Sequence, residues 1–209
     1  MEKCNTQYTA FDIECARCYK NDTPICEFGY VVFDDSFDII EKENIIINPK
    51  GKFKLTGRKG REDVILTYSK AHYKKQPYFY EYYQRIRDLL ECPNRIILNH
   101  AVRHDIGYIN FETKRYKLAP INFKAYDADI ILKLYEAKTG EKMKWSYIEA
   151  RFEGSGLMKH RAVDDAHLVM LCVQSVMTGL AISFQELTRN APIENMDGEI
   201  VKPIPKTAR

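Results

Sequence analysis

Three runs rich in Val, Ile, Phe and Tyr stand near the start of the chain. They span Tyr8 to Glu14, Glu27 to Phe33 and Ile39 to Asn48. β-branched and aromatic residues are typical of strands. Since strands joined by short connections pair in the antiparallel sense, these runs predict an antiparallel meander.

The hydrophobic pattern then changes to alternating helical and strand-like segments. From Pro77 to Leu90 the apolar residues recur at helical spacing, and Cys92-Pro93 ends this helix. The short apolar run Arg95 to Leu98 is typical of a buried strand, and Asp105 to Lys117 returns to helical spacing. A strand followed by a helix is the repeating unit of an α/β fold.

The later segments predict one more strand and three more helices. They span Phe123 to Tyr126, Asp129 to Ala137, Trp145 to Phe152 and Ala162 to Met177. We expect an α/β domain over residues 1–189, with a mixed sheet of three antiparallel strands continued by parallel ones and helices on its faces. Residues 190–209 are polar and carry three prolines, so we expect a loosely packed or disordered tail.

Composition narrows the class of protein only a little. The chain has 209 residues, a length suited to one domain. It lacks a run of about 20 apolar residues or an apolar signal segment, so we expect a soluble cytoplasmic protein without a membrane partner. We expect its six cysteines to be reduced; Cys15 and Cys18 form a CxxC pair without a second pair to complete a zinc site.

Net charge is +3, which neither requires nor excludes a nucleic-acid partner. The segment 50–61 is locally basic and contains three glycines. Two interpretations remain open for it. It is either a solvated loop or an arm that contacts phosphates.

Two carboxylates stand at the end of the first apolar strand, in the sequence FDIE at residues 11–14. Asp12 and Glu14 share one face because strand side chains alternate. Paired carboxylates repel each other unless a cation lies between them, and oxygen ligands favour Mg²⁺ or Mn²⁺. Solvated acids on an edge strand are the simpler alternative.

A third acid, Asp105, ends the sequence HAVRHD at residues 100–105, where a strand gives way to a helix. The ends of strands are where α/β sheets place chemistry. Because Asp is also favoured at helix starts, ordinary capping is the alternative.

The fourth segment is HRAVDDA at residues 160–166. On a helix, Asp165 stands above an apolar stripe and is predicted to face the protein, whereas Asp164 is predicted to face water. A carboxylate facing the core needs a partner or a cation. His160 lies five residues before Asp165, so we expect it on the preceding loop, within reach of solvent and substrate.

Together, FDIE, HAVRHD and HRAVDDA resemble the three motifs of the DEDDh exonucleases. This family includes the proofreading epsilon subunit of bacterial DNA polymerase III, ribonuclease T and oligoribonuclease. The resemblance covers residues 8–178 and implies a ribonuclease-H-like mixed sheet. It implies that Asp12, Glu14, Asp105 and Asp165 bind two Mg²⁺ or Mn²⁺ ions and that His160 is the general base.

The same resemblance points to Ile13, Cys15, Ala16 and His104 as contacts of the terminal nucleotide. Here the chain departs from the family pattern. Cys15 and Ala16 stand where relatives often have threonines, His104 stands where an aromatic residue is common, and Ala101 replaces a frequent asparagine. The choice between DNA and RNA is therefore left open.

The function implied is a two-metal 3′-to-5′ exonuclease acting on single-stranded DNA or RNA ends, with mononucleotide products. One alternative is a catalytically silent nucleic-acid-binding module tethered to a polymerase, a helicase or another replication or repair protein. Four converging carboxylates disfavour it, because without a metal they would destabilise the fold. A second alternative is an endonuclease on the ribonuclease H scaffold, which the spacing of His160 and Asp165 disfavours.

Overall fold

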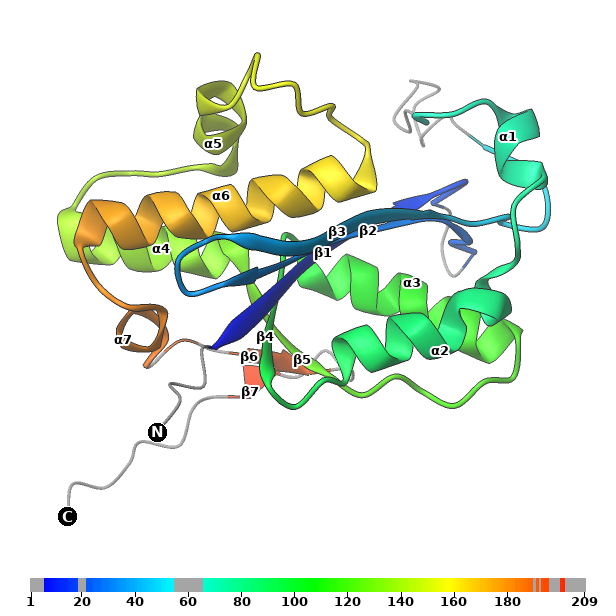
Figure 1. Ribbon diagram of the computed structural model, residues 1–209, viewed down its shortest axis with the longest axis horizontal. Helices are drawn as coiled ribbons and strands as arrows, with labels where there is room; N and C mark the ends of the chain where they lie inside the picture. The colour runs from blue at the N-terminus through cyan, green and yellow to red at the C-terminus, as the bar shows by residue number, and fades with distance from the viewer. Residues whose placement is uncertain are drawn as a thin grey trace.

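A seven-stranded mixed sheet organises the protein, in the order β3-β2-β1-β4-β5-β6-β7 (Figure 1). The computed structural model describes residues 6–18, 22–54, 66–189, 191, 193–195 and 200–201. β1, β2 and β3 are antiparallel, and β4 and β5 continue the sheet in parallel with β1. The predicted mixed sheet is confirmed. The strands are β1 (Gln7–Cys15), β2 (Ile25–Asp34), β3 (Ile39–Ile46), β4 (Arg95–Asn99), β5 (Lys124–Asp127), β6 (Ile193–Asn195) and β7 (Ile200–Val201).

Helices cover both faces of the sheet (Figure 1). They are α1 (Lys70–Lys74), α2 (Phe79–Leu90), α3 (Val102–Arg115), α4 (Ala128–Thr139), α5 (Trp145–Arg151), α6 (Ala162–Leu180) and α7 (Phe184–Thr188). One core cluster joins the sheet to α2 and α3, and a second joins it to α4, α5, α6 and α7. Among the helices of the described residues, none combines the length and apolarity needed to cross a bilayer.

The alternation along β1 decides which face carries the chemistry. Tyr8 and Ala10 belong to the core cluster on the α6 side, whereas Phe11 and Ile13 belong to the cluster on the α2 and α3 side. Asp12 and Glu14 continue the row of Tyr8 and Ala10 because side chains two positions apart share a face. Both carboxylates therefore lie on the α6 side.

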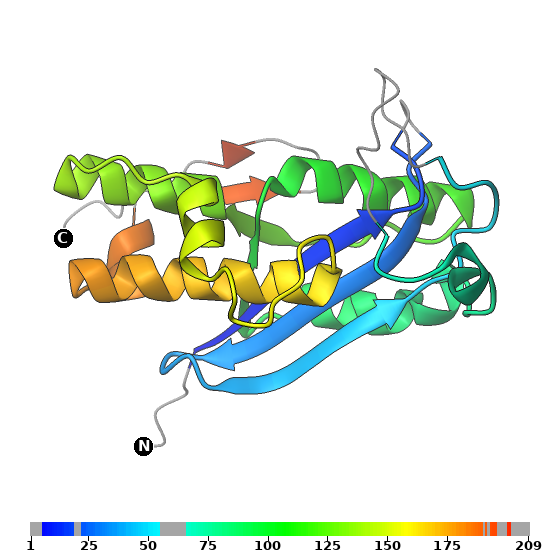
Figure 2. The ribbon, with the colours of Figure 1, turned by 90° about the horizontal axis from the view of Figure 1, so that it is seen from above.

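Gly29 of β2 lets the start of α6 approach this row closely. It pairs with Asp12 across the sheet. A Cβ at position 29 would lie 2.0 Å from the backbone of Ala162 and Val163, so a larger residue would push α6 away. In the view from above, α6 (yellow to orange) runs across the strands of the sheet (Figure 2).

Four short elements were not expected from the sequence, namely α1, α7, β6 and β7. The last two fall in the segment 190–209, where we expected loose packing. Residues 193–195 instead pair with β5, and residues 200–201 pair with β6. Backbone pairing along an open sheet edge needs no strong apolar pattern, so composition alone did not indicate it. In the basic segment 50–61, residues 55–61 lie outside the described part of the chain.

Candidate active site

The end of β1 carries the first two carboxylates of a cluster. Asp12 and Glu14 are partly exposed. Burial raises the pKa of Asp12 well above its usual range, and the charges of Asp105, Asp165 and Glu14 raise it further. The strongest charges acting on Asp12 are thus those of other acids, which is unfavourable unless a proton or a cation is bound.

Asp105 lies in the first turn of α3 and is 5% exposed. Asn99 Nδ2 donates a hydrogen bond to its Oδ2 at 2.7 Å. Burial raises the pKa of Asp105 well above its usual range. The helix start is capped instead by Asp127, whose Oδ2 accepts a hydrogen bond from the Val102 N–H at 3.1 Å. The capping alternative for Asp105 is therefore wrong.

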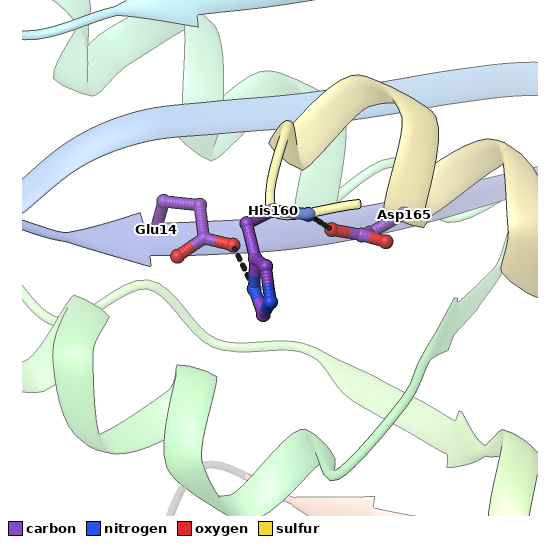
Figure 3. Close-up of side chains that lie close together, drawn as sticks. All are labelled: Glu14, His160 and Asp165. Atoms are coloured by element: carbon purple, nitrogen blue, oxygen red, sulfur yellow. Dashed lines mark hydrogen bonds and ion pairs between the residues drawn. The ribbon is translucent and has the colours of Figure 1, made fainter. Parts of the chain in front are cut away.

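Asp165 and His160 approach the end of β1 from the start of α6 (Figure 3). The His160 N–H donates to Asp165 Oδ2 at 2.8 Å, and His160 Nδ1 lies 3.7 Å from Glu14 Oε1. One ligand atom from each of Glu14, His160 and Asp165 lies within 4.8 Å of the others. The structure thus brings together two motifs that are about 150 residues apart in the sequence.

His160 lies on the loop before α6, as predicted, and its backbone has a positive φ of 60°. This left-handed conformation is uncommon for residues other than glycine. The Thr67 hydroxyl donates to the His160 carbonyl at 2.9 Å and holds the loop from the other side. The nearby Glu14 carboxylate raises the pKa of His160, and burial followed by the charge of Glu14 raises the pKa of Asp165 to about 7.

The prediction that Asp164 faces water is wrong, because Asp164 is 5% exposed. The Met158 N–H donates to its Oδ2 at 3.2 Å, Lys42 Nζ of β3 lies 3.4 Å from its Oδ1, and Arg161 lies 3.5 Å from its Oδ2. Helical spacing identified the outer side of α6 correctly, but the loop before the helix and β3 cover this side. Asp164 therefore joins the loop carrying His160 to α6.

The donor set fits hard divalent cations. Asp12, Asp105 and Asp165 all have pKa values raised chiefly by burial, and each is affected by the charge of another acid. Carboxylate oxygens are the ligands that Mg²⁺ and Mn²⁺ prefer, and a cation among them would offset this repulsion. Asn99 donates to Asp105 through Nδ2, and its buried Oδ1 has no hydrogen-bond partner within the described part of the chain.

The model of the RNase T family, described as exonucleases, matches residues 9–172. The chain belongs to the RNase T exonuclease family. The match covers all three motifs and ends within α6, so it includes every element that positions the cluster.

Solved structures share the fold of this RNase T family member. The nuclease domain of 3′hExo, a DEDDh family member bound to rAMP, is similar with a TM-score of 0.61 and 12% identity, over 87% of this chain and 97% of that one. Exonuclease I of E. coli in complex with a dA16 oligonucleotide is similar with a TM-score of 0.66 and 16% identity, over 88% of this chain and 42% of that one. Cell-death related nuclease 4 is similar with a TM-score of 0.64 and 12% identity, over 84% of this chain and 64% of that one. A sequence comparison with curated proteins gives no match.

The four residues predicted to contact the terminal nucleotide differ in exposure. Ile13, Cys15 and Ala16 are buried, with 6%, 2% and 0% exposure. The Cys15 thiol donates to the Thr23 carbonyl at 3.6 Å. His104 is exposed on α3. Nucleotide contact by these four residues stays a prediction, and the first three expose little side-chain surface.

Several supporting residues were missed by sequence reasoning. Glu27 of β2 is completely buried and pairs with Glu14 across the sheet. It accepts hydrogen bonds from Asn44 Nδ2 at 2.7 Å and from the Tyr73 hydroxyl, and burial raises its pKa. A charged residue inside the apolar run of residues 25–33 was a signal that could have indicated a buried role. Lys42, Thr67 and Asp127 gave no comparable signal.

Proposed function

We propose that this RNase T family member is a 3′-to-5′ exonuclease that hydrolyses single-stranded DNA or RNA ends by a two-metal mechanism. The observation that carries the proposal is the convergence of Glu14, His160 and Asp165 from β1 and α6, together with Asp12 and the buried Asp105, whose pKa values are both raised. Asp12, Glu14, Asp105 and Asp165 would hold two Mg²⁺ or Mn²⁺ ions. When bound, such ions stabilise the attacking and leaving oxygens and lower the pKa of the attacking water.

His160 is the residue proposed to take the proton from that water. Glu14 Oε1 lies beside Nδ1, which favours a proton on this nitrogen and leaves Nε2 as the basic atom of the neutral ring. In the free protein Glu14 raises the pKa of His160 and so favours the charged ring. Engagement of Glu14 by a cation would reduce this effect and return the ring to its basic form.

Asn99 and Asp127 are proposed to keep the third acid in place. Asn99 Nδ2 donates to both Asp105 and the Phe11 carbonyl, the latter at 2.8 Å, and so links α3 to β1. Asp127 fixes the start of the helix on which Asp105 lies. Both residues act on the orientation of Asp105 and not on the substrate.

Release of mononucleotides tests this proposal most directly. End-labelled single-stranded DNA, duplex DNA and RNA should be assayed with Mg²⁺, with Mn²⁺ and with excess EDTA. Both sugar types belong in the assay because exonuclease I of E. coli was solved with a DNA oligonucleotide and a 3′-exonuclease with histone mRNA stem-loop. We expect 5′-mononucleotides from single strands and none in EDTA.

A silent binding module would bind the strands and release nothing under any of these conditions. Activity that persists in EDTA would contradict the two-metal mechanism but would still show that the protein is a nuclease. An internal cut, detected as oligonucleotide products from a circular single strand, would favour the endonuclease alternative.

A further inference from the structure

A cavity of about 800 Å³ lies over the exposed side of α3. Asp105 lies in the first turn of this helix, so the exposed side of α3 leads away from the helix end that carries this acid. His104, adjacent to Asp105, lines the near end of the cavity, and Lys114 lines the far end. At 1.5 Å per residue, the distance from Asp105 to Lys114 along α3 is about 14 Å.

The cavity combines cationic and aromatic side chains at helical spacing. Arg103, Gly107, Phe111 and Lys114 follow one another three or four positions apart and line it together. We refer to these four residues and the space above them as the α3 groove. Cationic side chains suit the phosphates of a nucleic-acid strand, and aromatic rings suit its bases regardless of sequence.

Gly107 is at the middle of the α3 groove, in the interior of a 14-residue helix. Glycine lowers helix stability, so a glycine in a helix interior calls for a reason. Packing among the described residues supplies none, because a Cβ at this position would meet no atom of theirs within 4 Å. The missing side chain instead leaves the backbone of α3 open to the groove, where a ligand could approach it closely.

The far end of the groove is held rigid by Arg115. Its guanidinium donates to the Pro49 carbonyl at 3.0 Å and to Glu112 Oε1 at 3.2 Å. The Cζ atom lies 5.8 Å from the centre of the Phe111 ring and 5.4 Å from that of Tyr116. Arg115 therefore packs against the Phe111 ring from a position held by its own hydrogen bonds, which reduces the freedom that this ring would lose on binding.

We propose that the α3 groove binds the single strand on the 5′ side of the bond being cut, with a base stacked on Phe111 and a phosphate beside Lys114. This inference rests on the proposed exonuclease function, and it assigns the path of the strand away from the catalytic cluster. A strand long enough to reach Phe111 gains affinity that a dinucleotide lacks.

The test compares the affinities of the 209-residue chain and three variants of it, Phe111→Ala, Lys114→Ser and Gly107→Met. Binding of a fluorescent single strand of about 12 nucleotides, within the usual range of single-strand sites, is measured by anisotropy in EDTA. KM is then measured with Mn²⁺ for this strand and for a dinucleotide. Lys133→Ser, which removes an exposed lysine of α4, is the matched control for charge.

We expect Phe111→Ala to weaken binding of the long strand about 5-fold or more, the usual effect of losing one stacked base. Lys114→Ser should lower the slope of log affinity against log salt by about 0.7. Gly107→Met should also weaken the long strand, because its side chain fills the groove. Methionine forms helices more readily than glycine does, so we expect α3 to stay folded in this variant. In each variant KM should rise more for the long strand than for the dinucleotide, and Lys133→Ser should behave as the wild type.

Wild-type affinity and salt slope in all three groove variants would overturn the assignment, and so would a wild-type protein that binds no single strand. The binding measurement does not require hydrolysis. A wild type that releases mononucleotides while the groove variants bind normally would therefore refute the groove alone. A wild type that binds through the groove but releases nothing would refute the exonuclease activity and support the groove.

Discussion

The two sides of the proposed catalytic cluster are built differently. Asp12 and Glu14 stand on β1, which pairs with β2 along its whole length and with β4 over residues 7–10. His160 stands on a loop, residues 158–161, where its backbone has a positive φ and individual hydrogen bonds from Thr67 and to Asp165 hold it. The proposed metal ligands on β1 are thus fixed by the sheet, whereas the proposed base depends on a few contacts.

Because of this difference, substitutions on β1 and substitutions in the loop should impair activity in different ways. Changes on β1 should alter metal binding, because the strand is rigid and the carboxylates act through their charge. Changes in the loop should alter the position and protonation of His160 while the metal ligands stay in place. Glu14 joins the two sides, since it is a proposed ligand and also lies 3.7 Å from His160 Nδ1.

The largest effect is expected from Asp12→Asn. Turnover should fall by more than the factor of about 10² to 10⁴ that a lost general base costs, because one proposed ligand of the metal pair is removed. Calorimetric titration with Mn²⁺ should show weakened binding. The metal-free protein should melt at a higher temperature at neutral pH, since one of several neighbouring like charges has gone. Unchanged metal affinity would contradict the assignment of Asp12.

His160→Ala should lower turnover by about 10² to 10⁴ while metal binding is largely kept. The acid limb of the pH profile should change as well, because the group whose deprotonation it reports is absent. His104→Ala provides a histidine control from α3, with an effect expected on KM and not on the acid limb. Wild-type turnover in His160→Ala would require another base.

Asp164→Ala tests whether the loop is positioned through α6. Removal of this carboxylate deprives the Met158 N–H, Lys42 and Arg161 of a common partner. Turnover should fall about 10- to 100-fold, the size of effect that a small misplacement of a catalytic group produces. Asp164→Asn keeps an oxygen acceptor for the Met158 N–H and should restore part of the loss.

The readout that separates positioning from general destabilisation is metal affinity, which should stay at the wild-type value in Asp164→Ala. Asp88→Ala, at an exposed position of α2, is the matched control for removal of a carboxylate. Equal activities of Asp164→Ala and Asp88→Ala would show that the loop does not depend on Asp164.

The sequence predicted the β1 side of the cluster better than the loop side. Successive side chains of a strand point to opposite faces, whichever strands lie beside it in the sheet. The pattern of residues 8–14 therefore placed Asp12 and Glu14 on one face. Asp164 was misplaced because helical spacing gives the direction of a side chain but not what covers it. The same limit applies to α1 and α7, which have five residues each and are too short to show a helical period.

The role of Gly29 could not be predicted either, since it depends on the approach of a helix more than 130 residues later in the chain. The resemblance to DEDDh exonucleases compensated for these gaps at the motifs themselves. It did not indicate Glu27, Asn99 or Asp127, which support the cluster from β2, β4 and β5. Supporting residues of this kind are identified by their contacts in the folded structure, and motifs shared by a family do not record these contacts.

The smallest expected effect is on stability and depends on pH. Carboxyl groups in unfolded chains have pKa values near about 3.9, whereas the pKa of Asp165 in the fold is about 7, and those of Asp12 and Asp105 are also raised. Between these values the folded state binds more protons than the unfolded state. The free energy of unfolding should therefore fall as pH rises from about 4 to about 7.

His160 acts in the same direction at higher pH, because its pKa is raised in the fold and the stability it contributes is lost as pH rises through that value. Divalent cations should offset the loss by binding the ionised carboxylates, with about 2.7 kcal/mol of stabilisation at 100 times Kd. The rise in Tm on adding Mn²⁺ should thus be larger at about pH 8 than at about pH 5.5, where protons compete for the same oxygens. Thermal melts at both pH values in EDTA and in Mn²⁺ measure this difference. In Asp12→Asn the Mn²⁺-dependent rise should shrink at both pH values, and an equal rise in the variant and the wild type would place the stabilising metal elsewhere than on β1.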